Sequence, residues 1–135
     1  MIRWVGQEDQ YGCGPACLAM VLGLEYSEAK RLFLERFYPG HSFHNDGVHP
    51  VLLDVLLADH GYAVMRRWKS ETDPHWHRPF APVHVVTVYR ATGCHFEVML
   101  ADGSVLDPAS PPEPGKTKRL TGVNVRDVAG VFKVM

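Results

Sequence analysis

The sequence predicts an α+β fold in which N-terminal helices precede an antiparallel β-sheet. Segments whose apolar residues recur at helical spacing all lie before Gly61, whereas later apolar residues alternate or form short runs, as strands do. Clusters of glycine, proline and polar residues separate these later runs, which is typical of strands joined by turns. Helices followed by strands, without regular alternation, indicate the α+β class.

Length, composition and net charge limit the classes of protein to which this chain can belong. The 135 residues are expected to form one domain, residues 1–135, and a 46% hydrophobic content is enough for a core. A net charge of −1 does not favour a nucleic-acid partner, and no apolar run reaches the ~18 residues of a membrane span. The N-terminus lacks a signal-peptide core, so a cytoplasmic location with three free thiols is expected.

The first helix is expected to start where Gly12 and Gly14 allow a sharp reversal of the chain. Pro15 fits its first turn, since proline is tolerated there and not in a helix interior. Residues 16–22 are all apolar, which indicates a buried helix. Gly23 fits the C-terminal cap.

The second helix is expected over residues 28–37, with Ser27 as its N-cap and Pro39-Gly40 as its end. Its apolar side chains keep helical spacing and are Ala29, Leu32, Phe33 and Phe37. A loop is expected over residues 40–47.

The third helix is expected to start near Val48, with Pro50 in its first turn and Asp46 as a candidate cap. Its apolar residues are Val51, Leu52, Val55 and Leu56. Gly61 is expected to end it.

A β-hairpin is expected over residues 83–100. Residues 83–89 are apolar on both alternating faces with two exceptions, which suits a central strand, and residues 94–100 follow after a tight turn. Shorter strands are expected at residues 62–66 and 104–106.

Two proline-rich segments are expected to be surface loops. They cover residues 69–82 and 108–122, and the second includes a basic stretch at 115–119 that is expected to be solvated. Residues 123–135 are expected to supply one or two closing strands.

Cys13 is the first candidate functional residue. It lies between two glycines at the expected helix start, where unpaired N–H groups and the helix dipole favour a thiolate, the nucleophilic form of cysteine. The glycines also leave room for a substrate backbone. Cysteine is often a buried filler as well, so packing alone is the alternative interpretation.

A nucleophilic cysteine needs a base, and the base needs an orienting group. His95 lies in the second hairpin strand, on the face that it shares with Glu97 and Met99. Asp107 follows at the end of the next strand, where Pro108 keeps it extended. The alternatives are a half-exposed strand histidine and an ordinary Asp-Pro turn.

Gln7 is a candidate donor to an oxyanion. Acyl chemistry creates an oxyanion that a side-chain amide and a backbone N–H can stabilise. Gln7 precedes the expected helix, and the N–H of Cys13 would be the second donor. Gln10 competes for this role, and either glutamine can be a polar residue of the extended arm at residues 1–12.

The order Gln, Cys, His, Asp, with the cysteine on a helix and the other two on successive strands, is a papain-like arrangement. The segment at Cys13 resembles the nucleophile segment of the bacteriocin-processing, double-glycine-leader peptidases, and it reads Q-x5-C-G-x-A-C-L-A-M. The resemblance continues in F-A-P-V-H-V-V, in H-F-E-V-M-L at His95 and in V-L-D-P-A at Asp107. It therefore spans residues 7–109 in the family's order.

This resemblance implies a papain-like fold and a cysteine peptidase activity with no cofactor or metal. Cys13 would be the nucleophile, and His95 the general base and then acid. Asp107 would orient His95, and Gln7 would contribute to the oxyanion hole. The substrate would be a peptide or protein, cut after Gly-Gly if the family preference applies.

Three features depart from the family pattern. Gly12 stands where the family usually has an aspartate, which bears on substrate fit. Glu97 stands where an apolar residue is usual, and it can either pair with an arginine or compete with Asp107 for the imidazole. No transporter domains follow, so export-coupled leader removal is not implied, and a partner protein is left open.

Several other residues have a structural interpretation. Cys17 is expected in the core, and Cys94 neighbours His95. Trp76 and Phe80 can line a cleft or pack on the sheet. The remaining histidines fit no zinc spacing, so loop positions are the better interpretation for His41, His44, His49, His75, His77 and His84.

Two rival functions use the same residues. One is a degenerate relative that binds peptides without cutting them. The other is a different thiol acyl transfer, such as deamidation, transglutamination or removal of a ubiquitin-like tag.

Overall fold

The computed structural model of the chain describes residues 2–37, 47–91 and 93–135. In these ranges the helices are α1 (Cys13–Leu22), α2 (Tyr26–Arg36) and α3 (Pro50–Asp59). The strands are β1 (Tyr62–Trp68), β2 (Val83–Arg90), β3 (Gly93–Leu100), β4 (Ser104–Leu106), β5 (Lys118–Arg119) and β6 (Val125–Lys133). The predicted α+β order is confirmed. Outside the described ranges lie the expected helix end at Pro39-Gly40, most of the 40–47 loop, and Asp46, His41 and His44.

The strands of the described part form one antiparallel sheet in the order β1-β6-β2-β3-β4-β5. The predicted hairpin is β2 and β3, paired from Val83–Leu100 to Arg90–Gly93. The segment at residues 123–135 gives one strand, β6, which lies between β1 and β2. The last strand of the chain is thus an interior strand of the sheet and does not close it at an edge. β5 is a short strand within the 108–122 segment, which was expected to be a loop.

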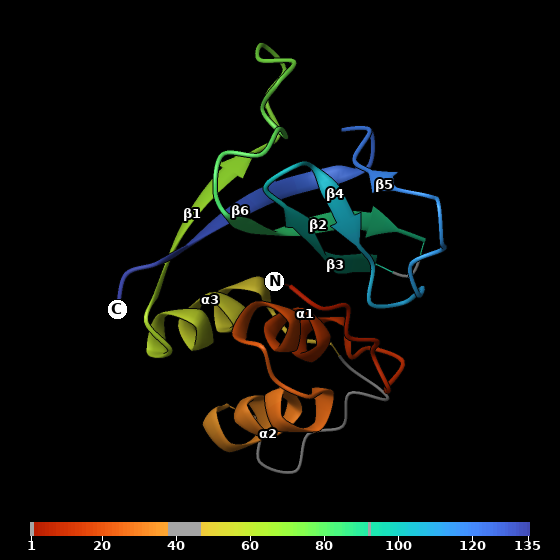
Figure 1. The fold of residues 1–135 in the computed structure, drawn as a ribbon. Helices are drawn as coiled ribbons and strands as arrows, with labels where there is room; N and C mark the ends of the chain where they lie inside the picture. The colour runs from red at the N-terminus through yellow and green to blue at the C-terminus, as the bar shows by residue number, and fades with distance from the viewer. Residues whose placement is uncertain (1, 38–46, 92) are drawn as a thin grey trace.

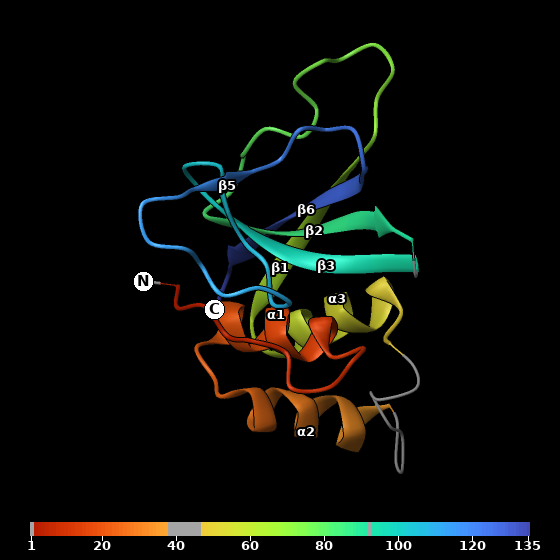
Figure 2. The same cartoon turned by 90° about the vertical axis from the view of Figure 1, so that its right-hand side faces the viewer.

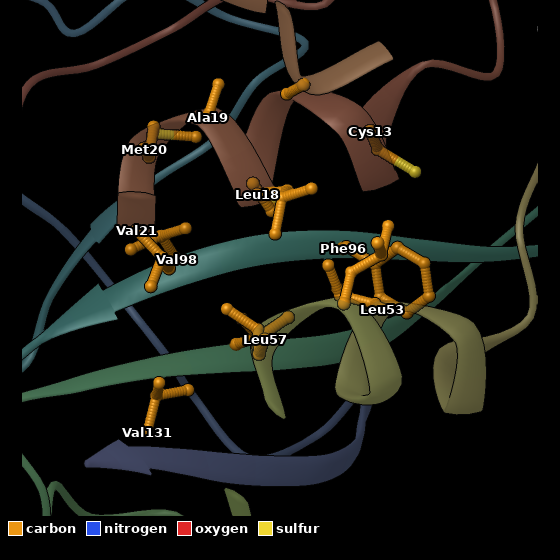
Figure 3. Close-up of a cluster of buried hydrophobic side chains, with 14 of the residues drawn as sticks. Cys13, Leu18, Ala19, Met20, Val21, Leu53, Leu57, Phe96, Val98 and Val131 are labelled. Carbon is orange, nitrogen blue, oxygen red and sulfur yellow. The ribbon is translucent and has the colours of Figure 1, made fainter. Parts of the chain in front are cut away.

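The helices lie on one face of the sheet in two layers. α1 and α3 lie next to the sheet, and α2 lies on the far side of α1 (Figures 1 and 2). α1 contacts both β3 and α2, while α3 contacts β1. Figure 3 shows how side chains of α1, α3, β3 and β6 meet between these layers.

The sandwiched position of α1 explains its apolar sequence. Its residues from Cys13 to Val21 are all buried, because the sheet covers one side and α2 the other, which leaves no face for polar residues. Gly23 caps the helix with a φ of 71°, in the left-handed region that favours glycine. Cys17 is fully buried in this core, as expected.

The starts of the other two helices differ from the prediction. α2 begins at Tyr26, and the Glu28 carboxylate accepts the backbone N–H of Glu25 at 3.3 Å. Ser27 is therefore inside the first turn and is not the N-cap. α3 begins at Pro50, which lies in its first turn as predicted, but its N-cap is His49, whose side chain accepts the Val51 N–H. A histidine ring nitrogen can cap a helix as a hydroxyl does, which the sequence preferences do not indicate.

The loop at residues 69–82 extends on the side of the sheet opposite the helices (Figure 1). Trp76 is 6% exposed and belongs to a second apolar cluster, whose other buried members are Val86, Val88, Met99, Val105, Val125 and Val128. Phe80 packs against the same cluster. Of the two interpretations of these aromatic residues, packing on the sheet is confirmed.

His84 was expected at a loop position, but it lies in β2 and is a structural histidine. It is fully buried, and its Nε2 accepts the backbone N–H groups of Phe80 and Ala81 at 2.9 and 3.0 Å. Its Nδ1 donates to the Met99 carbonyl at 3.1 Å. Burial lowers the pKa of His84 and keeps the ring neutral. Both ring nitrogens are used, so His84 has none to offer a metal.

None of the helices in the described ranges has the length and apolar character that crossing a membrane requires.

Replacement of Trp76 by alanine is expected to lower the free energy of unfolding by about 3 kcal/mol, because it opens a cavity between the 69–82 loop and the sheet. Trp68→Ala is the matched control, since Trp68 is 57% exposed. Chemical denaturation of both variants measures the difference. Equal losses would show that the 69–82 loop does not contribute to the core.

Candidate active site

Cys13 is the first residue of α1 and is 8% exposed. Gly12 is the N-cap, and its carbonyl accepts the Ala16 N–H at 3.1 Å. The N–H groups at the start of a helix have no partner within the helix, and together with the dipole they favour negative charge. In Figure 3 the Cys13 sulfur lies at this end of α1. The position therefore suits a thiolate.

His95 on β3 meets Asp107, the residue that follows β4. The His95 Nε2 lies 2.8 Å from the Asp107 Oδ1, and both residues are 8% exposed. β4 pairs with β3 only through Val98–Leu106 and Met99–Val105. The pairing therefore stops just before Asp107, which leaves its side chain free to turn toward His95.

Cys13 also interacts with this imidazole. Burial alone would lower the pKa of His95, but the hydrogen bond to Asp107 and the interaction with the Cys13 sulfur raise it to about 9. At neutral pH the ring is therefore an imidazolium that interacts with both a carboxylate and the Cys13 side chain. Such a cation favours the thiolate form of a neighbouring cysteine.

Asp107 is held as a carboxylate and is fixed in place. Burial would raise its pKa, but the bonds from His95, the Ala109 N–H and Arg90 hold the pKa well below its usual range. The backbone is fixed as well. The Trp4 indole donates to the Asp107 carbonyl at 2.8 Å, and the Gln7 N–H donates to the Pro108 carbonyl at 2.9 Å. The N-terminal arm thus anchors the chain that carries Asp107.

Gln7 lies in that arm, and its amide hydrogens are engaged. Its Nε2 donates to the carbonyls of Asp9 and Gln10 at 3.2 and 2.9 Å, while its Oε1 is buried without a hydrogen-bond partner. The Gln10 amide, the competing candidate, faces the Tyr11 hydroxyl at 3.5 Å. In this arrangement the backbone N–H of Gln7 binds next to Asp107, at Pro108, whereas its side chain supports the turn into α1.

Glu97 pairs with cations, the first of the two interpretations of this residue. It is 2% exposed, and its Oε2 lies 2.9 Å from both the Arg90 Nη2 and the Lys118 Nζ. The same oxygen is 3.9 Å from the His95 Nε2. The basic stretch at residues 115–119 is thus not solvated throughout, because Lys118 reaches into the site.

Sequence reasoning missed Arg90 and Lys118. A buried glutamate on a central strand needs a cation, since an unpaired buried charge is costly. Arg90, at the end of the neighbouring strand, could have been found by that rule. Lys118 comes from a loop whose path only the tertiary structure defines.

The ligand atoms of His95, Glu97 and Asp107 lie within 4.8 Å of one another, a spacing that a metal ion could use. Arg90 and Lys118 already contact both carboxylates. A metal would have to displace these cations, so the charge balance of the residues present does not fit one.

The glycine before the nucleophile position has a packing reason. A Cβ at Gly12 would collide with the Tyr26 hydroxyl, which donates to the Asp9 carboxylate at 2.7 Å. Burial, with this bond, raises the pKa of Tyr26, so the hydroxyl stays protonated. The space that a side chain would fill here is occupied by Tyr26.

The two remaining cysteines differ from Cys13. Burial raises the pKa of the Cys17 thiol well above its usual value, so Cys17 is an inert core residue. Cys94 is exposed, and its sulfur lies 3.9 Å from the Arg126 guanidinium.

Solved structures that are similar to this chain include two peptidases. One is a double glycine motif protease from an AMS/PCAT transporter, in complex with the leader peptide; the TM-score is 0.66 at 16% identity, over 99% of this chain and 93% of that one. The other is the peptidase domain of Streptococcus ComA, a bi-functional ABC transporter involved in quorum sensing; the TM-score is 0.65 at 18% identity, over 98% and 99%. The chain has the fold of these peptidase domains. No family model matches the chain, and no curated protein sequence matches it.

The fold thus confirms the resemblance that the motifs predicted, with N-terminal helices on an antiparallel sheet. At identities this low the likeness concerns the fold, and the chemistry depends on the side chains described above.

The pKa of His95 is expected at about 9 in the folded chain, and Asp107→Asn is expected to lower it because the charged acceptor is lost. The unfolded value is about 6.5. The stabilisation from His95 is therefore complete below about pH 6.5 and is lost as the pH rises through about 9. Ring NMR titration measures the midpoint, and denaturation on both sides of this range measures the stability. A midpoint that Asp107→Asn leaves unchanged would exclude Asp107 as the partner.

Gly12→Ala is expected to lower the free energy of unfolding by about 1–3 kcal/mol, because the new methyl group clashes with Tyr26. Gly47→Ala is the control, since its Cβ would make ordinary contact with Tyr11 at 3.8 Å. Adding Tyr26→Phe to Gly12→Ala should recover part of the loss. Additive losses in thermal or chemical unfolding would contradict the clash.

Proposed function

We propose that this chain is a cysteine peptidase, a thiol hydrolase in which Cys13, His95 and Asp107 act together. The observation that carries the proposal is the position of His95. It is bonded to Asp107 at 2.8 Å and also interacts with the Cys13 side chain. A thiolate, an imidazolium and a buried carboxylate in this order are the parts that thiol acyl transfer needs.

The reaction would proceed by acyl transfer in two halves. The Cys13 thiolate attacks the scissile carbonyl, and the imidazolium of His95 gives its proton to the leaving amine as the C–N bond breaks, which leaves a thioester. Neutral His95 then takes a proton from water, and the resulting hydroxide attacks the thioester. Collapse releases the acid and restores the thiolate and the imidazolium. Asp107 keeps the ring oriented and stabilises its charge.

The oxyanion formed in each half needs hydrogen-bond donors. The backbone N–H of Cys13 lies at the helix start, where it has no partner within the helix. Gln7 is proposed as the second donor. Its Nε2 binds the carbonyls of Asp9 and Gln10 at rest, so the side chain would have to release one of these when the substrate binds.

The proposed substrate is a peptide or protein, cut after Gly-Gly. Support comes from the structural neighbours, one described as a double glycine motif protease in complex with a leader peptide. The transporter origin of both neighbours makes a partner protein a proposal as well. Cys13, His95 and Asp107 are all present, which favours a peptidase over a peptide-binding relative that has lost activity.

Iodoacetamide near neutral pH is expected to alkylate Cys13 at least ~10-fold faster than Cys94, because only Cys13 has an imidazolium partner. Cys94 is the internal control, since it is exposed. Peptide mapping by mass spectrometry gives both rates in one sample. Equal rates would contradict the proposal that Cys13 is an activated nucleophile.

Cleavage is tested with a peptide library that contains Gly-Gly sites. Cys13→Ala should abolish turnover, and Gln7→Ala should reduce it by about 100-fold if Gln7 supplies an oxyanion donor. Gln10→Ala is the control for the arm and should retain turnover. Retained turnover in Cys13→Ala would place the nucleophile elsewhere.

A further inference from the structure

Two carboxylates compete for one nitrogen of His95. The Nε2 lies 2.8 Å from the Asp107 Oδ1 and 3.9 Å from the Glu97 Oε2. Both acids are buried, with side chains 9% and 2% exposed. The two oxygens differ by about 1 Å in their distance to the ring, so a small movement would exchange the partners.

Two cations bridge these carboxylates. The Arg90 Nη2 lies 2.9 Å from the Glu97 Oε2 and 2.8 Å from the Asp107 Oδ2. The Lys118 Nζ lies 2.9 Å and 3.2 Å from the same two oxygens. Each cation therefore binds the competing oxygen of Glu97 and the oxygen of Asp107 that does not face His95.

We propose that Arg90 and Lys118 are positioning residues that select Asp107 over Glu97 as the partner of His95. They hold the Glu97 Oε2 and the Asp107 Oδ2, which leaves the Asp107 Oδ1 as the acceptor closest to the ring. We call Arg90, Lys118, Glu97 and Asp107 the carboxylate clamp. The proposal depends on the proposed function for its effect on Cys13, but not for its effect on His95.

With Cys13 as the thiolate of the proposed mechanism, the charges around His95 balance. Negative charge faces it from Cys13 on α1, from Glu97 on β3 and from Asp107 after β4. Positive charge comes from Arg90 at the end of β2 and Lys118 on β5, and the imidazolium is the third cation. Three negative and three positive groups therefore share the site. Buried carboxylates are tolerated in this way, because each has a bonded counter-charge.

The exposure of the clamp fits a positioning role better than a surface one. The Arg90 and Lys118 side chains are 38% and 46% exposed, whereas the two carboxylates lie beneath them. A surface ion pair joins two exposed groups and contributes little. Here each cation covers a buried acid, so its loss would leave that acid less compensated.

Loss of one cation would free Glu97 to bind the His95 Nε2. The ring would turn toward β3 and away from the Cys13 sulfur, and the thiolate would lose its counter-ion. Two separate effects are expected in Arg90→Met. The pKa of His95 rises, because Arg90 lowers it in the native site, and Cys13 becomes less reactive at neutral pH.

The test uses the full chain and two readouts that need no substrate. These are the ring NMR titration of His95 and the rate of Cys13 alkylation by iodoacetamide. The variants are Arg90→Met, Lys118→Met, Glu97→Gln and the double variant Arg90→Met with Glu97→Gln. Lys116→Met is the matched control, because Lys116 lies in the same loop and pairs with Glu113 at 3.0 Å. Thermal unfolding of each variant confirms that it is folded.

The clamp predicts a specific pattern. Arg90→Met and Lys118→Met should slow alkylation several-fold and raise the His95 midpoint, whereas Glu97→Gln should lower the midpoint by about one pH unit. Glu97→Gln added to Arg90→Met should restore alkylation, since the competing acceptor is gone. Lys116→Met should change neither readout.

Two outcomes would overturn the proposal. One is Lys118→Met behaving like Lys116→Met. The other is a double variant slower than Arg90→Met, because a purely structural network would weaken further with each partner removed. If native Cys13 is unreactive, the proposed peptidase function fails, but the His95 midpoints still decide whether the clamp exists. If a single variant unfolds, Glu97→Gln alone tests the competition through its midpoint.

Discussion

The hydrogen bond between His95 and Asp107 is the interaction on which the rest of the site depends. It joins β3 to the chain that leaves β4, at the point where strand pairing has ended. Because the bond lies between a buried base and a buried acid, it holds one as a cation and the other as an anion. The N-terminal arm supports it through Trp4 and Gln7, whose N–H groups bind the backbone of Asp107 and Pro108. Distant parts of the chain thus stabilise one hydrogen bond, that between His95 and Asp107.

The position of α1 supplies the other half of the site. The helix is buried between the sheet and α2, so its N-terminus cannot shift without disturbing both layers. Close packing at its start explains the glycines, since a side chain at Gly12 would meet Tyr26 and one at Gly14 would meet Val48. A rigid helix end therefore holds Cys13, the proposed nucleophile, in place. Preorganisation of this kind is what the proposed acyl transfer requires.

The charge network shows how this chain differs from the pattern its motifs resemble. A glutamate in place of an apolar residue introduces a second carboxylate beside the imidazole. Arg90 and Lys118 compensate it, and they come from the end of β2 and from β5, which are far apart in the sequence. The departure of Glu97 from the family pattern therefore comes with Arg90 and Lys118, the two cations that pair with it.

The sequence alone determined the class of the fold, the buried first helix with Cys13 at its start, the β2–β3 hairpin that carries His95, and the position of Asp107 at a strand end. These follow from local patterns, namely apolar periodicity, glycine and proline turns and the order of chemically active residues. The cap of α2 was missed because the N-cap is Glu25, which forms a capping box with Glu28, and not Ser27. Only the tertiary structure decided that β6 is a central strand, that the Gln7 amide binds the carbonyls of Asp9 and Gln10, and that Lys118 reaches Glu97. These features are contacts between segments without a shared local pattern, and they arise when the folded chain brings unpaired donors, acceptors and buried charges together.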